Sequence, residues 1–446
     1  MNSYQYDNAL FTVQVARKHF FSDKIYQLYL FQDEIVMTDN TLRQPKYTIK
    51  LNLTTTINWI VQDNKILAFS FTYKNTIKPF YAPKLQLLKE MIAGRVFYTS
   101  INEFYQIQMV VGNGMSGEVY RCVSNTGEYF AVKKCEKMKL ASHEGGIPQL
   151  IHELSLLQSL QHPNILKLKE VYTDESYYYI VTEFIEGRAL STELQSRPYG
   201  LSVAETIKIM LQILDALIYI SERGIMHRDI NPHNIMKSEP IKLIDFGLAR
   251  KIKNQLIFPT SGTPGYIAPE IINFNKDKLY DDRADVYSLG CVLYKLLTGE
   301  NLFHKQKNIF QENKEGIYEL RKNYQHPEVN SIKMDSLFIL LPYMLENDPN
   351  NRMTAKVCKI VIQEIDNNNQ QIEKLIKKLV IFKFFLLSTE ETHNENKTPH
   401  SMSSHSHKNK KQSIDMLKRS DDTSQKGHKK QQQTMGNLNL SFATKK

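Results

Sequence analysis

Four polar side chains from three separate blocks of the chain could together transfer a phosphoryl group. Lys133 ends the apolar run YFAVK, Asp229 and Asn234 belong to HRDINPHN, and Asp245 follows the apolar run IKLI. Transfer to a hydroxyl needs a carboxylate that orients the nucleophile and accepts its proton, and Asp229 suits that role. The amide oxygen of Asn234 and the carboxylate of Asp245 are hard ligands of the kind that Mg²⁺ prefers. The pattern predicts a site for a nucleotide triphosphate with magnesium.

A glycine-rich segment precedes Lys133 and could bind phosphates. Glycine lets backbone N–H groups approach phosphate oxygens because no side chain stands in the way. By itself such a segment is equally compatible with a hairpin that binds nothing, and a lone strand lysine is usually a solvated edge residue. The order of the blocks favours binding, since a strand paired to this hairpin would point the Lys133 ammonium at the phosphates. The segment comprises Val111, Gly112, Asn113, Gly114, Met115, Ser116, Gly117, Glu118 and Val119.

The helical pattern that follows, HELSLLQSL, carries Glu153, which could turn inward and hold Lys133 in place. With this helix, the chain shows eight short blocks in an order that resembles the eukaryotic protein kinase family: GNGMSG, AVK, HE, HRD with Asn234, DFG, GTPGYIAPE, DVYSLG and DPNNR. The resemblance covers residues 105–365 and implies an enzyme that uses ATP and Mg²⁺. Asp229 would be the catalytic base, and Asn234 and Asp245 would hold the metal.

The resemblance also implies an α+β fold of two lobes, the first rich in strands and the second helical, with ATP between them. Val119, Ala131 and Met236 would surround the adenine. Thr182 would be the gatekeeper, and the hinge would run through Glu183, Phe184 and Ile185. A stacked spine of Leu157, Leu168, His227 and Phe246 would be anchored by Asp285, and Glu270 would pair with Arg352. The spine residues would be ordinary core in any fold.

The segment GTPGYIAPE is similar to that of serine/threonine kinases, in which a threonine at the position of Thr263 contacts the catalytic carboxylate. The implied substrate is a protein with a serine or threonine hydroxyl. The run FIEGRAL after the hinge resembles the calmodulin-dependent kinase group. Relatives that select a substrate arginine carry acidic residues where this chain has Ala189 and His233, so that preference is not expected.

One catalytic-loop residue departs from the family pattern. Serine/threonine kinases usually carry a lysine two residues after the catalytic aspartate, and this chain has Asn231. Removing one positioned electrostatic donor typically costs about 100- to 1,000-fold in rate. Because the other catalytic residues are retained, we expect a slow but active enzyme. The alternative is a nucleotide-binding pseudokinase that acts as a scaffold.

Arg228, just before the catalytic aspartate, suggests by family analogy that a phosphate on the activation segment could order that segment. Thr260 and Ser261 are the candidate phosphosites. The alternative is that they are polar loop residues.

Other segments flank the catalytic region. Residues 1–104 alternate β-type stretches with polar turns and end in PKLQLLKEMIAG, a helix pattern. Antiparallel strands closed by one helix resemble a PH-like domain in element order. Arg17, Lys18 and Lys24 lie near its first hairpin, where such domains bind phosphoinositides, but YQLYLF lacks the usual basic pair, which favours a protein ligand. Residues 366–387 are predicted to be a helical extension, and 388–446 a disordered basic tail.

Composition excludes several other classes. The four cysteines stand far apart, without the spacing of a zinc site or a disulfide framework, which favours a reducing compartment. The apolar run from Leu379 to Leu387 is too short to span a bilayer, so we predict a cytoplasmic protein and leave peripheral membrane contact open. About half of the net charge of +10 comes from the last sixty residues. A solvated tail is favoured over nucleic-acid binding, because aromatic interleaving is missing.

Overall fold

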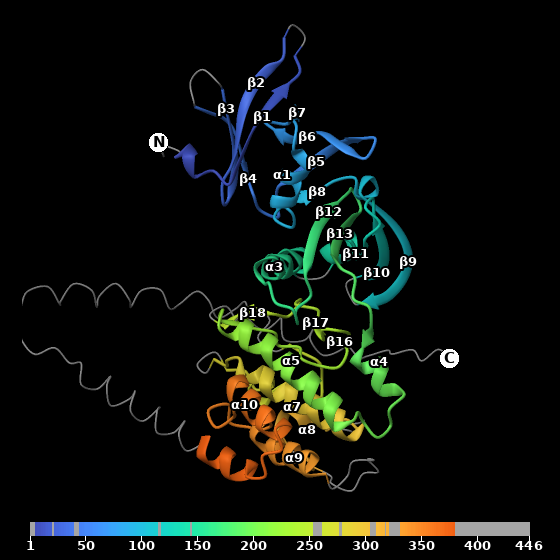
Figure 1. The fold of residues 1–446 in the computed structure, drawn as a ribbon, viewed down its shortest axis with the longest axis vertical. Helices are drawn as coiled ribbons and strands as arrows, with labels where there is room; N and C mark the ends of the chain where they lie inside the picture. Colours follow the sequence, from blue (N-terminus) through green and yellow to red (C-terminus); the bar gives the residue numbers. More distant parts are fainter. Residues whose placement is uncertain are drawn as a thin grey trace, which may run out of the picture. The chain divides into compact units, whose positions relative to one another are not determined.

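The structure is a computed structural model in which the chain from Met1 to Lys383 forms one compact unit (Figure 1). All four cysteines are buried free thiols. The predicted tail, Met115, Ser116 and Thr260 lie outside the described residues. These residues are 5–19, 22–39, 44–114, 117–142, 145–252, 261–275, 279–303, 309–316, 318–320 and 331–379.

The N-terminal module, residues 5–104, is an antiparallel sheet closed by one helix. Its strands follow the order β4-β3-β2-β1-β7-β6-β5. The period of two is clear in β2, where Tyr26, Leu28 and Leu30 are buried, Gln27 and Tyr29 between them are half-buried, and the preceding Ile25 is exposed. The elements are β1 (Phe11–Arg17), β2 (Lys24–Leu30), β3 (Glu34–Asp39), β4 (Pro45–Lys50), β5 (Thr56–Gln62), β6 (Lys65–Tyr73), β7 (Thr76–Tyr81) and α1 (Leu85–Met91).

The module contains more strands than the sequence patterns indicate. The stretch KIYQLYLFQDEIVM forms β2 and β3, which turn back on each other where the Phe31 N–H donates to the Glu34 carbonyl. Strand β7 contains Pro79, a residue that argues against a strand because it lacks an N–H to donate. The turn before β7 explains its formation, since Lys74 and Asn75 both adopt positive φ, as a two-residue type I′ hairpin requires.

The first lobe is a five-stranded sheet of order β12-β13-β11-β10-β9 that carries helix α3. Helix α3 buries Leu150, Leu154 and Leu157, whose spacing places them on one face with Glu153 among them. The elements are β9 (Tyr105–Gly114), β10 (Gly117–Ser124), β11 (Tyr129–Glu136), α2 (Lys137–Ala141), α3 (Gly146–Ser159), β12 (Leu168–Thr173) and β13 (Tyr177–Glu183).

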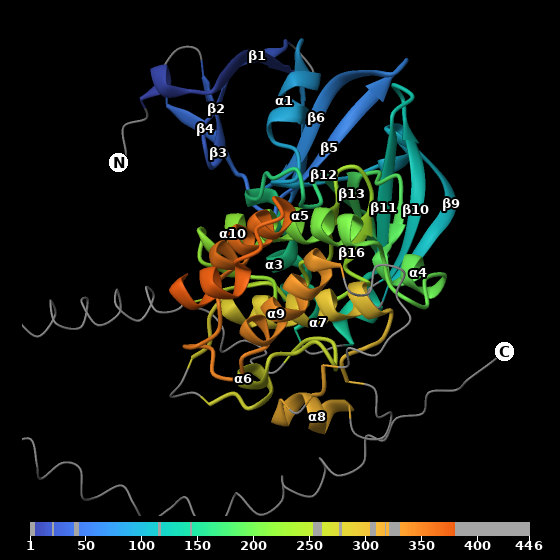
Figure 2. The same cartoon turned by 60° about the horizontal axis from the view of Figure 1, so that its bottom comes forward.

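The second lobe is mainly helical, and α5, α7, α9 and α10 pack around one apolar core (Figure 2). Residues 372–379 are helical, within the predicted extension, and Ile372 and Ile376 join this core. The elements are β14 (Arg188–Ala189), α4 (Leu190–Gln195), α5 (Val203–Ser221), β15 (Ile225–Met226), β16 (Ile235–Lys237), β17 (Lys242–Leu243), β18 (Arg250–Lys251), α6 (Pro269–Ile272), α7 (Arg283–Thr298), α8 (Ile309–Glu315), α9 (Ile332–Met344) and α10 (Ala355–Asp366).

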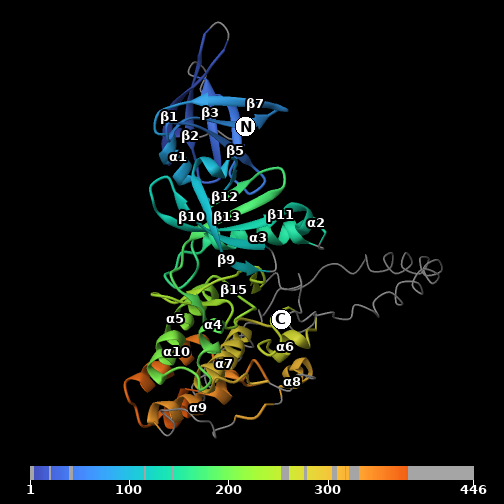
Figure 3. The same cartoon turned by 90° about the vertical axis from the view of Figure 1, so that its right-hand side faces the viewer.

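A two-residue strand, β8 (Phe97–Tyr98), joins the N-terminal module to the first lobe (Figure 1). Figure 3 shows β5 of the module next to β12 of the lobe. It pairs in parallel with β5 of the module and with β12 of the lobe, so one 13-stranded sheet runs through both. Because β12 would otherwise be the edge of the first-lobe sheet, β8 supplies partners for an exposed edge.

A buried ion pair lies at the same junction. Lys89 of α1 and Glu170 of β12 are 2.5 Å apart and only 3% and 4% exposed. Tyr105 and Tyr172 both donate to the Glu170 carboxylate, and the Lys89 ammonium lies 4.2 Å from the centre of the Phe104 ring. Burial lowers the pKa of Lys89, and Glu170 opposes this effect. Removing one partner would therefore leave a desolvated, uncompensated charge.

We predict that Lys89→Ala lowers the free energy of unfolding by about 3–5 kcal/mol, because Glu170 would stay buried without its cation. Lys50→Ala is the matched control, since Lys50 pairs with Glu34 in the same module but its side chain is 66% exposed. The control should cost no more than about 1 kcal/mol. Denaturant unfolding of the full chain measures both variants, and equal losses would contradict a structural role for the buried pair.

Candidate active site

Lys133 lies at the centre of a charged cluster where β11 meets α3. Its ammonium is 3.9 Å from the Glu153 carboxylate. Burial lowers the pKa of Lys133, but the nearby carboxylates of Glu153 and Asp245 outweigh burial and hold the pKa above its ordinary value. The ammonium therefore stays charged at neutral pH. The structure brings together three residues that lie far apart in the sequence, as the order of the motifs predicts.

Gly247 and the glycines of the glycine-rich segment differ in what a side chain at each position would meet. A Cβ on Gly247, next to Asp245, would lie 3.1 Å from the Asp245 carboxylate and 3.5 Å from that of Glu153. A Cβ on Gly117 would collide with the Lys134 carbonyl, so Gly117 is required by strand packing. Among the described residues, a Cβ on Gly112 would meet only the Val119 side chain, at 3.8 Å. Protein packing thus does not explain Gly112, whereas close approach of a phosphate would.

The Asp229 carboxylate is oriented by hydrogen bonds on both of its oxygens. Oδ1 accepts from the Thr263 hydroxyl at 2.6 Å and from the Thr263 N–H at 3.0 Å. Oδ2 accepts from Nδ2 of Asn234 at 2.7 Å. These contacts join the catalytic loop to the segment that carries Thr263. A carboxylate held in this way is pre-organised to receive a proton from a hydroxyl placed beside it.

Asn231 lies within the same network. Its Nδ2 donates to Asp229 Oδ1 at 2.9 Å and to the Thr263 hydroxyl at 3.0 Å, and its Oδ1 accepts from the His233 N–H. The side chain is buried. Asn231 thus holds the catalytic loop together, but it brings no positive charge.

Asn234 and Asp245 form a donor set that fits Mg²⁺. Nδ2 of Asn234 donates to the backbone carbonyl and to the carboxylate of Asp229, which leaves the amide oxygen of Asn234 facing away from that carboxylate. Asp245 follows β17 with φ of 60°, a left-handed conformation that is uncommon for aspartate. Arg228, beside the catalytic aspartate, has φ of 67°. Strained backbone of this kind concentrates at functional sites.

Asp285 of α7 holds the backbone of the loop that contains Asp229. Its two oxygens accept from the backbone N–H groups of His227 and Arg228 at 2.7 and 2.8 Å. Burial raises the pKa of Asp285 to about 7, and the two backbone N–H groups oppose this effect.

The His227 ring packs edge-on against Phe246 at 4.7 Å, and Leu157 and Phe246 belong to the same core. Arg352 is buried and pairs with both oxygens of Glu270.

The residues expected around the adenine come from two sheets, the sheet of the first lobe and the three-stranded sheet β14-β16-β17. Ala131 of β11 pairs with the buried Thr182 of β13, and Val119 of β10 pairs with Lys133. Met236 lies on β16 and pairs with Ala189. The expected hinge begins at Glu183, whose carboxylate accepts from the Lys242 ammonium at 2.8 Å, and continues through Phe184 and Ile185 to β14.

Two polar contacts of α3 were not anticipated from the sequence. The Gln149 side chain donates to the Gly247 carbonyl at 3.0 Å, and the His152 ring lies 3.2 Å from the Ala249 carbonyl. They tie α3 to the segment that follows Asp245. No local pattern indicates them, because their partners are backbone carbonyls nearly a hundred residues away.

Two arginines, Arg228 and Arg250, contact the backbone of the segment that follows Asp245. Arg228 donates to the Leu248 carbonyl, and Arg250 is buried and donates to the Gly247 carbonyl. Burial and the neighbouring Arg228 guanidinium together lower the pKa of Arg250. Two like charges in close proximity make this a region where an anion would be stabilised. Ser261 is half-buried.

The sequence resembles known proteins over the region that builds this site. The family model described as the protein kinase domain matches residues 105–363. The chain is 32% identical over 317 residues to the probable serine/threonine-protein kinase fhkD of Dictyostelium discoideum, which covers 67% of this chain and 41% of that protein. It is also 32% identical to calcium-dependent protein kinase 5 of Plasmodium falciparum, over 70% of this chain and 54% of that protein.

A third relative is the calcium/calmodulin-dependent protein kinase type II alpha chain of Drosophila melanogaster, at 32% identity over 58% of this chain and 48% of that protein. The chain therefore spans roughly half the length of the relatives that it matches. Among the described helices, none combines the length and the apolar character that crossing a membrane requires.

Proposed function

Because this chain belongs to the protein kinase family, we propose that it transfers the γ-phosphoryl group of Mg·ATP to serine or threonine hydroxyls of a protein. The observation that carries the proposal is the Asp229 carboxylate, which is held by Thr263 on one oxygen and by Asn234 on the other. The family match also confirms the predicted α+β catalytic domain. Serine/threonine specificity is supported by the similarity to a probable serine/threonine-protein kinase.

Each step of the proposed reaction has a residue suited to it. Asp229 orients the substrate hydroxyl and accepts its proton while the new bond between oxygen and phosphorus forms and the bond to the β-phosphate oxygen breaks. ADP leaves with that oxygen. Lys133 would hold the α- and β-phosphates, and Glu153 holds Lys133. Bound Mg²⁺, which Asn234 and Asp245 would ligate, supplies charge neutralisation for the triphosphate.

The presence of Asn231 supports a lower rate of phosphoryl transfer than the lysine of the family pattern would give. At this position a lysine would place positive charge near the transferring group, and the charge would stabilise the transition state. Asn231 instead donates the hydrogen bonds of its amide nitrogen to Asp229 and Thr263. The same observation favours the second candidate function, a scaffold that binds nucleotide without transferring phosphate.

We also propose that the N-terminal module is a PH-like domain that contacts a protein. Its strands and closing helix have the element order of such a domain. A phosphoinositide is less well supported, because two of the basic residues near the first hairpin are already engaged. Arg17 donates to the Tyr47 hydroxyl at 2.9 Å, and the Lys18 ammonium lies 4.8 Å from the centre of the Tyr81 ring.

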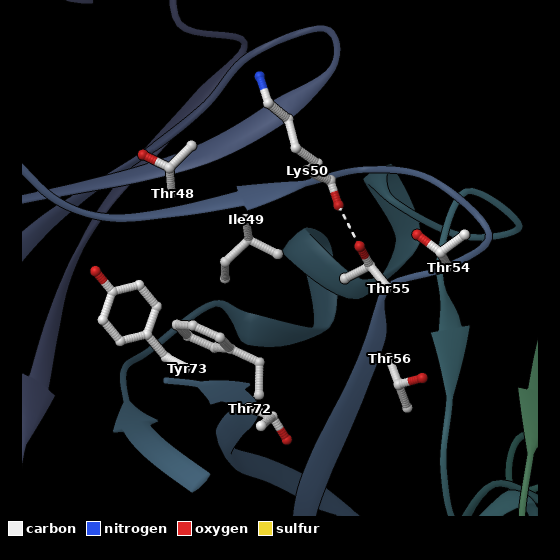
Figure 4. Close-up of a pocket in the computed structure, with 9 residues that line it drawn as sticks. Thr48, Ile49, Lys50, Thr54, Thr55, Thr56, Thr72 and Tyr73 are labelled. Atoms are coloured by element: carbon white, nitrogen blue, oxygen red, sulfur yellow. Dashed lines mark hydrogen bonds between the residues drawn. The ribbon is translucent and has the colours of Figure 1, made fainter. Parts of the chain in front are cut away.

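A cavity of about 360 Å³ on this module also does not favour a phosphate ligand (Figure 4). Lys50 is the cationic residue in the lining of this cavity. Its side chain points away from Thr72 and Tyr73 and pairs with Glu34. The remaining lining is apolar or hydroxylated, and a hydroxyl is a weaker partner for a phosphate than a cation is. The lining residues are Thr48, Ile49, Lys50, Thr54, Thr55, Thr56, Phe71, Thr72 and Tyr73.

We predict that the purified full chain phosphorylates itself or a general protein substrate, and that Asp229→Asn lowers the rate at least about 100-fold, because the proton acceptor is lost. Glu239→Gln, which makes the same chemical change at an exposed position, should keep the wild-type rate. Transfer of radiolabelled phosphate from ATP measures all three proteins. Wild-type protein that binds Mg·ATP but transfers no phosphate would favour the scaffold.

Asn231→Lys should raise kcat about tenfold or more, because it adds a cation near the transferring group. Asn231→Ala is the matched variant, since it removes the hydrogen bonds of the amide without adding charge, and its kcat should fall. Steady-state kinetics with saturating ATP distinguishes the two effects. If Asn231→Lys leaves kcat unchanged while the protein stays folded, missing charge does not limit this site.

Phosphorylation of Thr260 or Ser261 should activate the enzyme, because the phosphate would pair with Arg228 and Arg250. Mass spectrometry of active protein should find phosphate on this segment, and phosphatase treatment should lower the rate. The Thr260→Ala/Ser261→Ala double variant should be as slow as the dephosphorylated protein. An unmodified segment in fully active protein would rule out this form of activation.

A further inference from the structure

Strand β8 sends its two side chains to opposite faces of the sheet, as the period of a strand requires. Tyr98 enters the core shared by the N-terminal module and the outer face of the first lobe, and its hydroxyl donates to the Lys89 carbonyl at 2.6 Å. Phe97 enters a different cluster, on the face that carries α3. One short segment of the module therefore reaches the helix that holds Glu153.

This second group of buried residues, here called the α3 cluster, contains side chains from both parts of the chain. Phe97 is 3% exposed, and its ring lies 5.1 Å from that of Tyr178, which packs against the cluster. Leu53, from the turn between β4 and β5, is the second contribution of the module. The members are Leu53, Phe97, Cys135, Leu150, Leu154, Val171 and Ile180.

The α3 cluster lies next to the catalytic ion pair along both elements that carry it. On α3, Leu154 directly follows Glu153, and Leu150 precedes it by one turn. On β11, Cys135 lies two residues after Lys133 and therefore on the same face of the strand. The ammonium and carboxylate form an ion pair at 3.9 Å, which is longer than a hydrogen bond, so a small displacement of α3 would separate them.

Helix α3 has other supports, but they act on different parts of it. Leu156 and Leu157 near its end join the core of the second lobe. Gln149 and His152 contact the carbonyls of Gly247 and Ala249. Leu150 and Leu154 lie on the side of α3 that packs against the first-lobe sheet. The module contributes Leu53 and Phe97 to the packing on this same side.

We propose that the N-terminal module is a built-in positioning element for catalysis, in which Phe97 and Leu53 hold α3 so that Glu153 can pair with Lys133. Both are positioning residues, because they act through α3 and touch no reacting atom. The inference rests on the proposed phosphotransfer activity. The module is suited to this task because the parallel pairing of β8 and the buried Lys89–Glu170 pair fix it to the lobe.

The test compares two full-chain variants that remove the same side chain from the same module. Phe97→Ala removes a ring from the α3 cluster. Phe80→Ala is the control, since Phe80 is fully buried among Tyr26, Phe69 and Phe71 inside the module and is not a member of the α3 cluster. Phe97→Leu is the conservative variant. For each protein we would measure the thermal midpoint, kcat and KM for ATP, and hydrogen exchange of the α3 amides.

Phe97→Ala should lower kcat/KM for ATP about tenfold or more and speed exchange of the α3 amides, while Phe97→Leu restores most of both. Phe80→Ala should lower the thermal midpoint at least as much but keep kcat/KM within about twofold at a temperature where it is folded. Equal losses of kcat/KM in the two alanine variants, or unchanged kcat/KM in folded Phe97→Ala, would overturn the proposal. If Phe97→Ala does not fold, Leu53→Ala takes its place with the same expected pattern.

The exchange measurement keeps this inference separate from the proposed function. If the wild-type protein transfers no phosphate, the proposed activity fails, but α3 exchange can still be compared between Phe97→Ala and Phe80→Ala. Faster exchange in Phe97→Ala alone would retain the positioning role. Identical α3 exchange in both variants would remove it, whatever the activity of the wild type.

Discussion

The ion pair between Lys133 and Glu153 is the interaction on which the arrangement of this molecule depends. It joins the central strand β11 to helix α3, and the Asp245 carboxylate also stabilises the charge of Lys133. Each member is fixed by its own surroundings: Lys133 by the register of β11 between β10 and β13, and Glu153 by the apolar face of α3. Because neither element can supply this charged site alone, the sheet, the helix and the strand end that precedes Asp245 must form together.

Charges buried elsewhere in the chain follow the same physical rule. Lys89 meets Glu170 inside a group of aromatic rings, Arg352 meets both oxygens of Glu270, and Asp285 accepts two backbone N–H groups. Each of these groups would be costly to desolvate without its partner. They lie at the junctions between elements far apart in sequence, so they favour one arrangement of those elements over others.

The sequence indicates which polar residues lie together near Asp229 because these residues stand at fixed spacing within short blocks. Asp229, Asn231 and Asn234 are separated by only a few residues, and the structure brings them together with Thr263. The junction could not be predicted in this way. Strand β8 has two residues, too few for a period, and Lys89 and Glu170 are 81 positions apart. Strand β7 is hard to predict because Pro79 argues against a strand when it is considered alone.

The most direct measurement of the central claim is calorimetric titration of the full chain with a non-hydrolysable ATP analogue, with and without Mg²⁺. Because Lys133 and the Asn234–Asp245 pair would contact different parts of one ligand, binding should require Mg²⁺ for full affinity and should weaken about tenfold or more in Lys133→Met. Binding that is absent under both conditions, or that is the same in folded Lys133→Met, would contradict the assignment of this cluster as a triphosphate site.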